Sequence, residues 1–203
     1  MPKGIRILHI SVGERNLTQF GGIFLVHQFC KKLNLKWRLQ NYVKFPYYHR
    51  RYHPVELILA MIYALIAGIH RLNKTKTLQG NGAFQQIVGL KNFPYSGSLR
   101  RFLKRVNPKT IQGINKVHDY LRLKMFYLPK PRTSLLFDFD SSVLTLYGKL
   151  IEGAERGYSP RRRGARSYHP LLCFEYHSKD FWHGILRPGN VYTSTGSVEF
   201  LKI

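Results

Sequence analysis

The sequence predicts an α+β protein in which a basic helical region is followed by a short series of β-strands. Three observations predict this division. The apolar run Leu57–Ile69 has the length of a core helix, residues Leu135–Asp140 alternate as a strand does, and two prolines in Pro129–Arg132 separate the two patterns. We therefore predict a helical region over residues 1–130 and a strand-rich region over residues 131–203.

The helical region is expected to contain several segments, each with its own start or stop signal. In chain order they are a helix that follows Gly21-Gly22 and leads from Ile23 into Leu33 and Leu35, a buried helix that begins at Pro54 and ends near Gly68, a weaker helix over Leu78–Leu90, a basic helix capped by Ser96 or Ser98, and a helix from Pro108 to about Phe126. The apolar run of the second segment predicts that it lies at the centre of this region.

The basic helix is amphipathic. Its apolar residues, which share one face, are Leu99, Phe102, Leu103 and Val106, and the rest of its surface carries Arg100, Arg101, Lys104 and Arg105. Such a face suits the phosphates of a nucleic-acid backbone. A solvated helix with no ligand has the same pattern, so both interpretations stay open.

Three strands are predicted after the prolines. They are Ser134–Val143, Leu171–Tyr176 and Phe181–Leu186, with a glycine-rich basic link over 157–166 between the first two and a short helix over Val198–Leu201 at the end. Three strands do not bury enough surface to stand alone. We therefore expect this region to be part of a larger sheet that the chain does not complete.

Charge is the strongest guide to partners. The 203 residues include 33 Lys and Arg against 10 Asp and Glu, which gives a net charge of +23 and an isoelectric point near 10.3. This balance predicts a nucleic-acid partner first and an anionic membrane surface second. The 13 Tyr and 13 Phe exclude a disordered basic arm.

No segment has the pattern of a targeting sequence or a membrane span. The longest apolar run, Leu57–Ile69, has 13 residues, fewer than the ~20 that a spanning helix needs. Cys30 and Cys173 are far apart and form no Cys-x-x-Cys pair, so a thiolate zinc site is not predicted. We expect a cytoplasmic protein with no membrane partner.

The first predicted strand carries two carboxylates on one face. Side chains alternate along a strand, so Asp138 and Asp140 point the same way, just before Ser141-Ser142. Carboxylates next to apolar residues need a partner, and a divalent cation that acts on nucleic-acid phosphate would be one. The alternative is that Asp138 or Asp140 caps a local turn.

A second candidate site is the basic link. It carries Arg161, Arg162, Arg163 and Arg166 between glycines, and arginine clusters bind phosphate well. We predict that this link contacts a DNA backbone, with Arg187 in Arg-Pro-Gly-Asn as a second contact. The alternative is a solvated surface loop.

Several blocks in order resemble the DDE transposases of bacterial insertion sequences, transposase DDE domain group 1, of the insertion sequence 1380-like type. The resemblance is carried by Asp138-Phe139-Asp140-Ser141-Ser142, Tyr147-Gly148, Glu152-Gly153-Ala154, Gly157-Tyr158-Ser159-Pro160, Tyr168-His169-Pro170-Leu171 and Leu186-Arg187-Pro188-Gly189-Asn190. It also includes Gly21-Gly22 and the Ser98-Leu99-x-Arg101-Phe102-Leu103 helix, and so covers most of the chain.

This resemblance implies the first three strands of a ribonuclease H-like catalytic domain. It implies that Asp140 is the first acid of a catalytic triad, with Asp138 as its neighbour, and that Mg²⁺ supports cleavage of the element's ends and strand transfer into target DNA. The implied partner is double-stranded DNA, as transposon ends and as target, and a homo-oligomer is a further partner that the resemblance allows.

The second Asp and the final Glu of the triad would lie beyond residue 203. The resemblance therefore implies an incomplete copy that binds DNA without cutting it. Among the remaining acids, Glu175 is the best stand-in, because it could face Asp140 across the sheet. Asp180 is expected to form a turn.

Other functions remain open at this point. One is an inactive DNA-binding fragment that regulates transposition, and another is a basic RNA-binding protein. A third is an unrelated ribonuclease H-like nuclease that needs no specific DNA ends.

Overall fold

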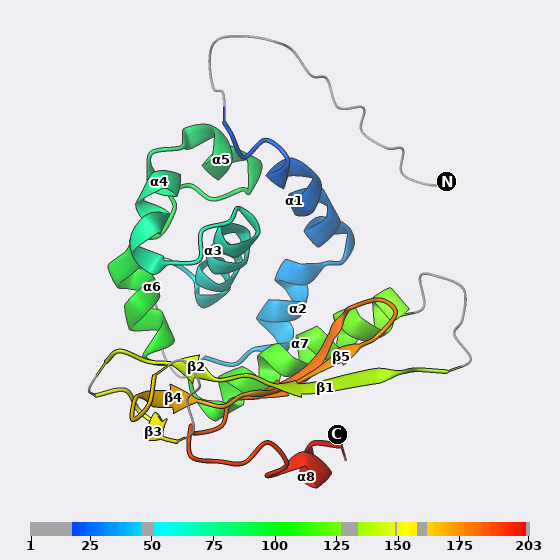
Figure 1. Cartoon of the computed structure of the whole chain (residues 1–203). Coiled ribbons are helices and arrows are strands. Elements are labelled where there is room, and N and C mark those ends of the chain that lie inside the picture. The colour runs from blue at the N-terminus through cyan, green and yellow to red at the C-terminus, as the bar shows by residue number, and fades with distance from the viewer. Residues whose placement is uncertain (1–17, 46–50, 127–133, 149, 158–161, 202–203) are drawn as a thin grey trace. The chain divides into compact units, whose positions relative to one another are not determined.

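The computed structural model describes residues 18–45, 51–126, 134–148, 150–157 and 162–201 (Figure 1). The chain divides into two compact units, Met1–Leu121 and Arg122–Ile203. The predicted boundary at Pro129–Arg132 lies outside the described residues and stays a prediction.

The first unit is helical throughout its described residues. Its helices are α1 (Ile23–Lys32), α2 (Leu35–Tyr42), α3 (Pro54–Ile66), the 3-10 helix η1 (Leu72–Thr75), α4 (Lys76–Gln79), α5 (Gly82–Ile87), α6 (Ser96–Leu103) and α7 (Pro108–Phe126), the last of which runs on into the second unit. The predicted helices at Pro54 and at Pro108–Phe126 are confirmed.

Helix α3 is the core of this unit. His53 caps its first turn, because the His53 backbone N–H donates to Glu56 Oε2 at 2.9 Å and His53 Nδ1 accepts from the Val55 N–H at 3.3 Å. Gly68 ends the helix with a φ of +80°, as predicted, and the Ile69 N–H then bonds to the Ala64 carbonyl. The α3 side chains that the core buries are Val55, Leu57, Ile58, Leu59, Ala60, Tyr63 and Ala64.

Two predicted helices are interrupted, and one begins elsewhere. Asn34 adopts a left-handed conformation (φ +52°) between α1 and α2, and Asn81 caps α5 by accepting from the Phe84 N–H at 2.9 Å. The predicted cap of α6 is wrong: Tyr95 is the N-cap, the helix already includes Ser96, and Ser98 is a buried residue of its first turn.

The described part of the second unit forms two three-stranded antiparallel sheets. The larger sheet has the order β1 (Phe137–Ser141), β5 (Leu171–Glu175) and β6 (Phe181–Ile185), which confirms the three predicted strands with shorter bounds. The smaller sheet has the order β2 (Leu144–Thr145), β4 (Arg166–Tyr168) and β3 (Glu155–Arg156). The sequence predicted a link here, because strands of two or three residues have no readable periodicity.

One face of the larger sheet is covered by the short helix α8 (Ser197–Leu201), close to the predicted position. Phe200 of α8 packs on Leu171 and Cys173, with Phe137 and Trp182 at the edge of this small core. The segment after β6 also packs closely on the smaller sheet at Gly189, since a Cβ there would stand 2.6 Å from the carbonyl oxygens of Glu155 in β3 and Ser167 in β4. No described helix is both long and apolar enough to cross a bilayer.

Candidate catalytic strand and basic surfaces

Strand β1 places its two carboxylates on the sheet face opposite the small core. Asp138 lies across from Phe174 and Asp140 across from Leu172, and both aspartates are exposed. Phe137 and Ser141, by contrast, lie on the face that α8 covers, where Phe137 contacts Trp182 at 4.8 Å between ring centroids. The alternation of the strand therefore presents both carboxylates to solvent on one surface.

Glu175 cannot complete this acidic pair. Its register partner is Phe137, so its side chain lies on the face opposite Asp138 and Asp140. It is 1 % exposed, and its Oε2 accepts from the Ser178 N–H and from Ser178 Oγ, each at 2.7 Å. The expectation that Glu175 faces Asp140 is wrong, and Glu175 instead holds the turn between β5 and β6.

The end of β1 is fixed by a hydrogen-bond network that sequence reasoning missed. The Ser141 N–H donates to Asp140 Oδ1 at 2.8 Å, and Ser141 Oγ lies 3.1 Å from His169 Nε2. His169 Nδ1 lies 2.9 Å from the Val191 carbonyl oxygen, and because a carbonyl only accepts, Nδ1 is the protonated nitrogen. His169 thereby ties the residue after Asp140 to the segment before α8. The only sequence signal for this network was the Tyr-His-Pro block, and that block alone does not indicate which atoms His169 contacts.

Arg187 is a buried side chain that also binds the segment before α8. It is 6 % exposed, and it donates through Nε to the His169 carbonyl at 2.9 Å and through Nη1 to the carbonyls of Thr193 and Thr195. Burial lowers the pKa of this guanidinium from its ordinary value. Because Arg187 is buried and its Nε and Nη1 donate to backbone carbonyls inside the unit, it does not present a phosphate-binding surface, and the structure contradicts the predicted DNA contact at Arg187.

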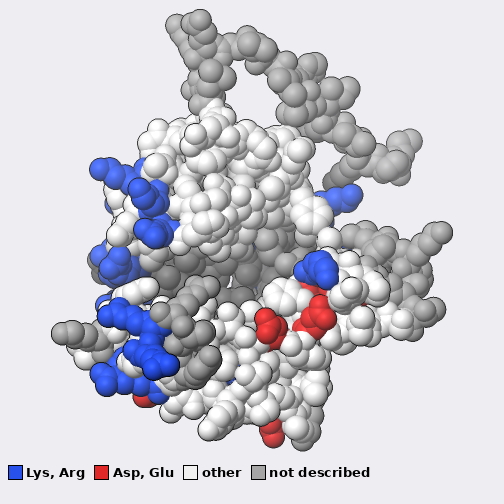
Figure 2. All heavy atoms as spheres, in the orientation of Figure 1, with Lys and Arg blue, Asp and Glu red and all other residues white. Residues whose placement is uncertain are grey.

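The basic side chains of the second unit gather over its smaller sheet. Arg156 and Arg166 lie on β3 and β4, and Arg162 and Arg163 precede β4; all four are exposed. Figure 2 shows them as a blue patch at the lower left. Arg161 lies outside the described residues. The structure thus brings Arg162, Arg163 and Arg166 onto one surface and adds Arg156, which the sequence analysis did not select.

The first unit has a separate basic surface over α4 and α6 (Figure 2). Arg100 and Arg101 are exposed on α6, and Lys104 and Arg105 are exposed directly after its last residue, Leu103. Arg100 donates to Asn73 Oδ1 at 3.2 Å and lines a shallow hollow together with Arg71 and Lys74. Leu103 departs from the predicted apolar face, because it is 46 % exposed, whereas Leu99 and Phe102 are buried.

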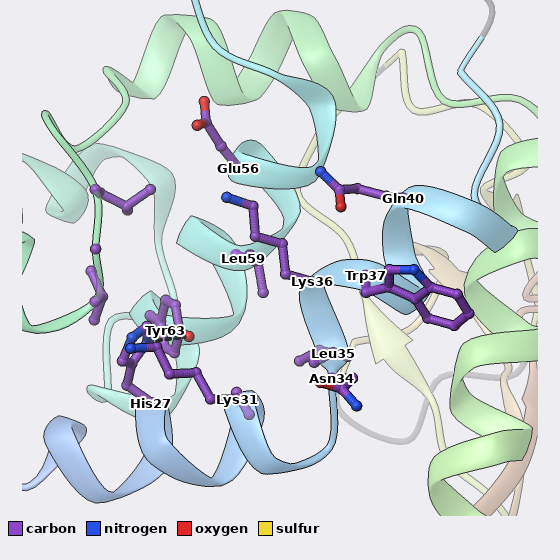
Figure 3. A pocket seen from close by; sticks show the side chains of 14 residues that line it. His27, Lys31, Asn34, Leu35, Lys36, Trp37, Gln40, Glu56, Leu59 and Tyr63 are labelled. Carbon is purple, nitrogen blue, oxygen red and sulfur yellow. Dashed lines mark hydrogen bonds between the residues drawn. The ribbon is translucent and has the colours of Figure 1, made fainter.

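The first unit also has a pocket of about 410 Å³ between α1, α2, α3 and the residues after α5 (Figure 3). His27 Nδ1 lies 2.9 Å from the Tyr63 hydroxyl at its floor. Burial, with Lys31 second, lowers the pKa of His27, and burial raises the pKa values of Tyr63 and Cys30. These three groups are therefore neutral at pH 7, and the pocket offers no activated nucleophile.

The described residues provide only some of the ligands that a divalent metal needs. No group of three or more His, Cys, Asp or Glu side chains comes together there. Mg²⁺ prefers six oxygen ligands, and it is commonly bound through one or two carboxylates together with waters and substrate phosphates. Asp138 and Asp140 could supply the one or two carboxylates of such a Mg²⁺ site, but two carboxylates do not make a two-metal centre.

Comparisons with known proteins give one match. The family model described as transposase DDE domain group 1 matches residues 4–203. Comparisons with curated proteins and with solved structures give no match. Because the family model spans nearly the whole sequence, the chain belongs to the DDE transposases, in the transposase DDE domain group 1 family.

Proposed function

We propose that this chain binds double-stranded DNA at transposon ends through its basic surfaces, and that Asp140 is the first metal ligand of a ribonuclease H-like catalytic centre. The family acts on DNA and uses divalent metal ions. The observation that carries the proposal is the pair of exposed carboxylates on β1, in a unit whose smaller sheet bears exposed arginines. We assign the 1380-like subtype on the same blocks of sequence.

The acids of the chain support a division of roles. Asp140 lies at the end of β1, next to the Ser141–His169 contact that fixes the strand end. Asp138 is two residues earlier on the same face and is the second oxygen donor. Asp140 and Asp138 would hold the Mg²⁺, which would supply positive charge against a DNA phosphate, and the contacts at the end of β1 hold Asp140 in place.

Within the described residues, the third carboxylate of such a centre is missing. Glu175 is turned to the other face, Asp180 lies in the β5–β6 turn, and Glu152 and Glu155 belong to the smaller sheet or its approach. We therefore infer that the chain of 203 residues binds DNA but does not cut it.

The first experiment measures binding and cleavage together. Purified chain is titrated with duplexes that carry the element's terminal sequence, with random duplexes, and with RNA of the same length, at several salt concentrations. We expect duplex DNA to bind most tightly, with affinity that falls steeply as salt rises, because neutralised phosphates release counterions. Affinity that stays flat with salt, or preference for RNA, would contradict the proposal.

Cleavage is assayed in the same samples with Mg²⁺. We expect no nicking by the wild-type chain and no loss of duplex binding in Asp140→Ala. Magnesium-dependent nicking that Asp140→Ala abolishes would show that the chain is catalytically complete and that the binding-only inference is wrong. It would also support the assignment of Asp140.

A further inference from the structure

The smaller sheet places two arginines directly opposite each other. In the antiparallel pair of β3 and β4, Arg156 is the register partner of Arg166, and both side chains are exposed. Residues in this relation project from the same face with their Cβ atoms roughly 5 Å apart. Like charges at such positions repel, so the pair destabilises the hairpin unless something neutralises it.

No carboxylate neutralises the pair within the described residues. The next register pair, Glu155 with Ser167, projects from the opposite face because strand side chains alternate. Arg166 has one long contact, from Nη1 to the Ala154 carbonyl at 3.5 Å. The two-residue strand pairing therefore holds two cations on one face, and no acid among the described residues lies between them on that face. Such an arrangement is typical of a site that binds an anion.

The two arginines also line a common hollow. It has a volume of about 300 Å³, and its other lining residues are Leu146, Gly148 and Gly164. Gly164 has a φ of +71°, and a Cβ at that position would meet nothing within 4 Å, so the rim is open to an approaching group. The hollow has room for a tetrahedral oxyanion with several waters.

We propose that Arg156 and Arg166 bind one phosphate group between them in this hollow. The planar guanidinium forks match phosphate oxygens bidentately, and one shared anion converts the repulsion between the two side chains into attraction to a common centre. On the proposed function, this group is a backbone phosphate of bound DNA. Inorganic phosphate has the same chemistry and is the probe for the isolated site.

The first test uses inorganic phosphate against chloride at equal ionic strength. Amide hydrogen exchange in residues 144–168 reports the stability of the smaller sheet. We expect phosphate to slow exchange there several-fold in the wild-type chain and to leave Arg156→Gln unchanged. Arg163→Gln is the matched control, because it removes the same charge from the same segment but does not line the hollow. It should respond to phosphate as the wild type does.

A second variant separates an anion site from an ordinary structural arginine. Arg156→Glu places a carboxylate opposite Arg166, so it should slow exchange without phosphate and abolish the phosphate response. Arg156→Gln should also exchange no faster than the wild type in chloride, because the repulsion is gone. Faster exchange in both variants, or a phosphate response that persists in them, would overturn the proposal.

The DNA arm uses the same variants. If both arginines share one phosphate, the double variant Arg156→Gln with Arg166→Gln lowers the slope of log affinity against log salt by about 0.9 in total, and Arg156→Gln alone lowers it by less, because Arg166 still contacts the same phosphate. Two independent contacts would instead lose about 1.8 together. That additive result, or an unchanged slope, would overturn the shared site.

The two proposals fail in different ways. A wild-type phosphate response without duplex binding would leave the anion site standing and contradict the proposed function. The opposite result is duplex binding without any phosphate response, with salt slopes that the Arg156 variants do not change. It would contradict the anion site and leave the proposed function standing.

Discussion

The two units of the chain are stabilised by different means. Among the described residues, the first buries nineteen apolar side chains in one cluster around α3, whereas the apolar cluster of the second buries three, Leu171, Cys173 and Phe200. The second unit relies instead on a buried arginine, a histidine bridge and close backbone packing at Gly189. The comparison teaches that strand β1 and its surroundings are held by polar contacts and close backbone packing, which tolerate substitution less evenly than a large apolar core.

The largest expected effect is in the core of the first unit. Leu57 is fully buried, so Leu57→Ala should lower the free energy of unfolding by about 3–4 kcal/mol through lost transfer energy and the cavity left behind. Urea unfolding followed by far-UV circular dichroism measures this. Leu65→Ala, on the same helix at 55 % exposure, should change stability by less than ~0.5 kcal/mol. Equal losses in the two variants would mean that α3 is not the core.

In the second unit, the substitution with the largest expected effect adds a single methyl group at Gly189. Gly189→Ala places a Cβ against Ser167 Oγ and 2.6 Å from the Glu155 carbonyl oxygen, and both neighbours belong to strands that cannot easily shift. We expect a loss of about 2–3 kcal/mol, seen as faster hydrogen exchange in β3 and β4. Gly80→Ala, where a Cβ meets nothing within 4 Å, is the control and should be neutral or slightly stabilising.

The polar anchor is tested with Arg187→Met, which keeps an unbranched apolar stem and removes the guanidinium donors. Carbonyls of His169, Thr193 and Thr195 lose their partner, at a cost of about 1.5–2 kcal/mol. Hydrogen exchange should rise in residues 187–201. Arg163→Met removes an exposed arginine of the same unit and should leave exchange there unchanged. If Arg187→Met instead weakened DNA binding without changing exchange, its assignment as a buried anchor would be wrong.

The smallest expected effect is a pH dependence in the first unit. Burial lowers the pKa of His27, so the unfolded chain, with a His pKa near 6.5, takes up a proton before the folded chain does. The stability of this unit is therefore complete above about pH 6.5 and falls as pH drops toward the folded pKa. His27→Gln should flatten the dependence between pH 7 and pH 5, and His70→Gln, at an exposed position, should not. An unchanged slope in His27→Gln would exclude this histidine as the cause.

The sequence predicted regular elements better than it predicted side-chain surroundings. Helix α7 and the helix at Pro54 both begin at a proline, and their predicted positions are confirmed. The break at Asn34 was missed because one left-handed residue leaves the apolar pattern on both sides intact. The smaller sheet was missed because its strands are too short to alternate visibly.

Only the part of the candidate site that lies within one strand could be predicted from the sequence. That Asp138 and Asp140 share a face follows from the period of a strand. The face of Glu175 relative to them depends on the register between β1 and β5, which no local pattern fixes. The burial of Arg187 depends on carbonyls six and eight residues away and on His169, so charge alone suggested a surface role.

Strand β1 is an edge of the larger sheet as the structure describes it, and this gives its carboxylates a further consequence. An edge strand offers unpaired backbone groups to any neighbouring chain, and charged side chains on it oppose self-association. Neutralising Asp138 or Asp140 beside Phe139, which is 46 % exposed, removes that protection. Aspartate variants of this strand should therefore aggregate more readily than the wild type, and light scattering belongs beside every assay that uses them.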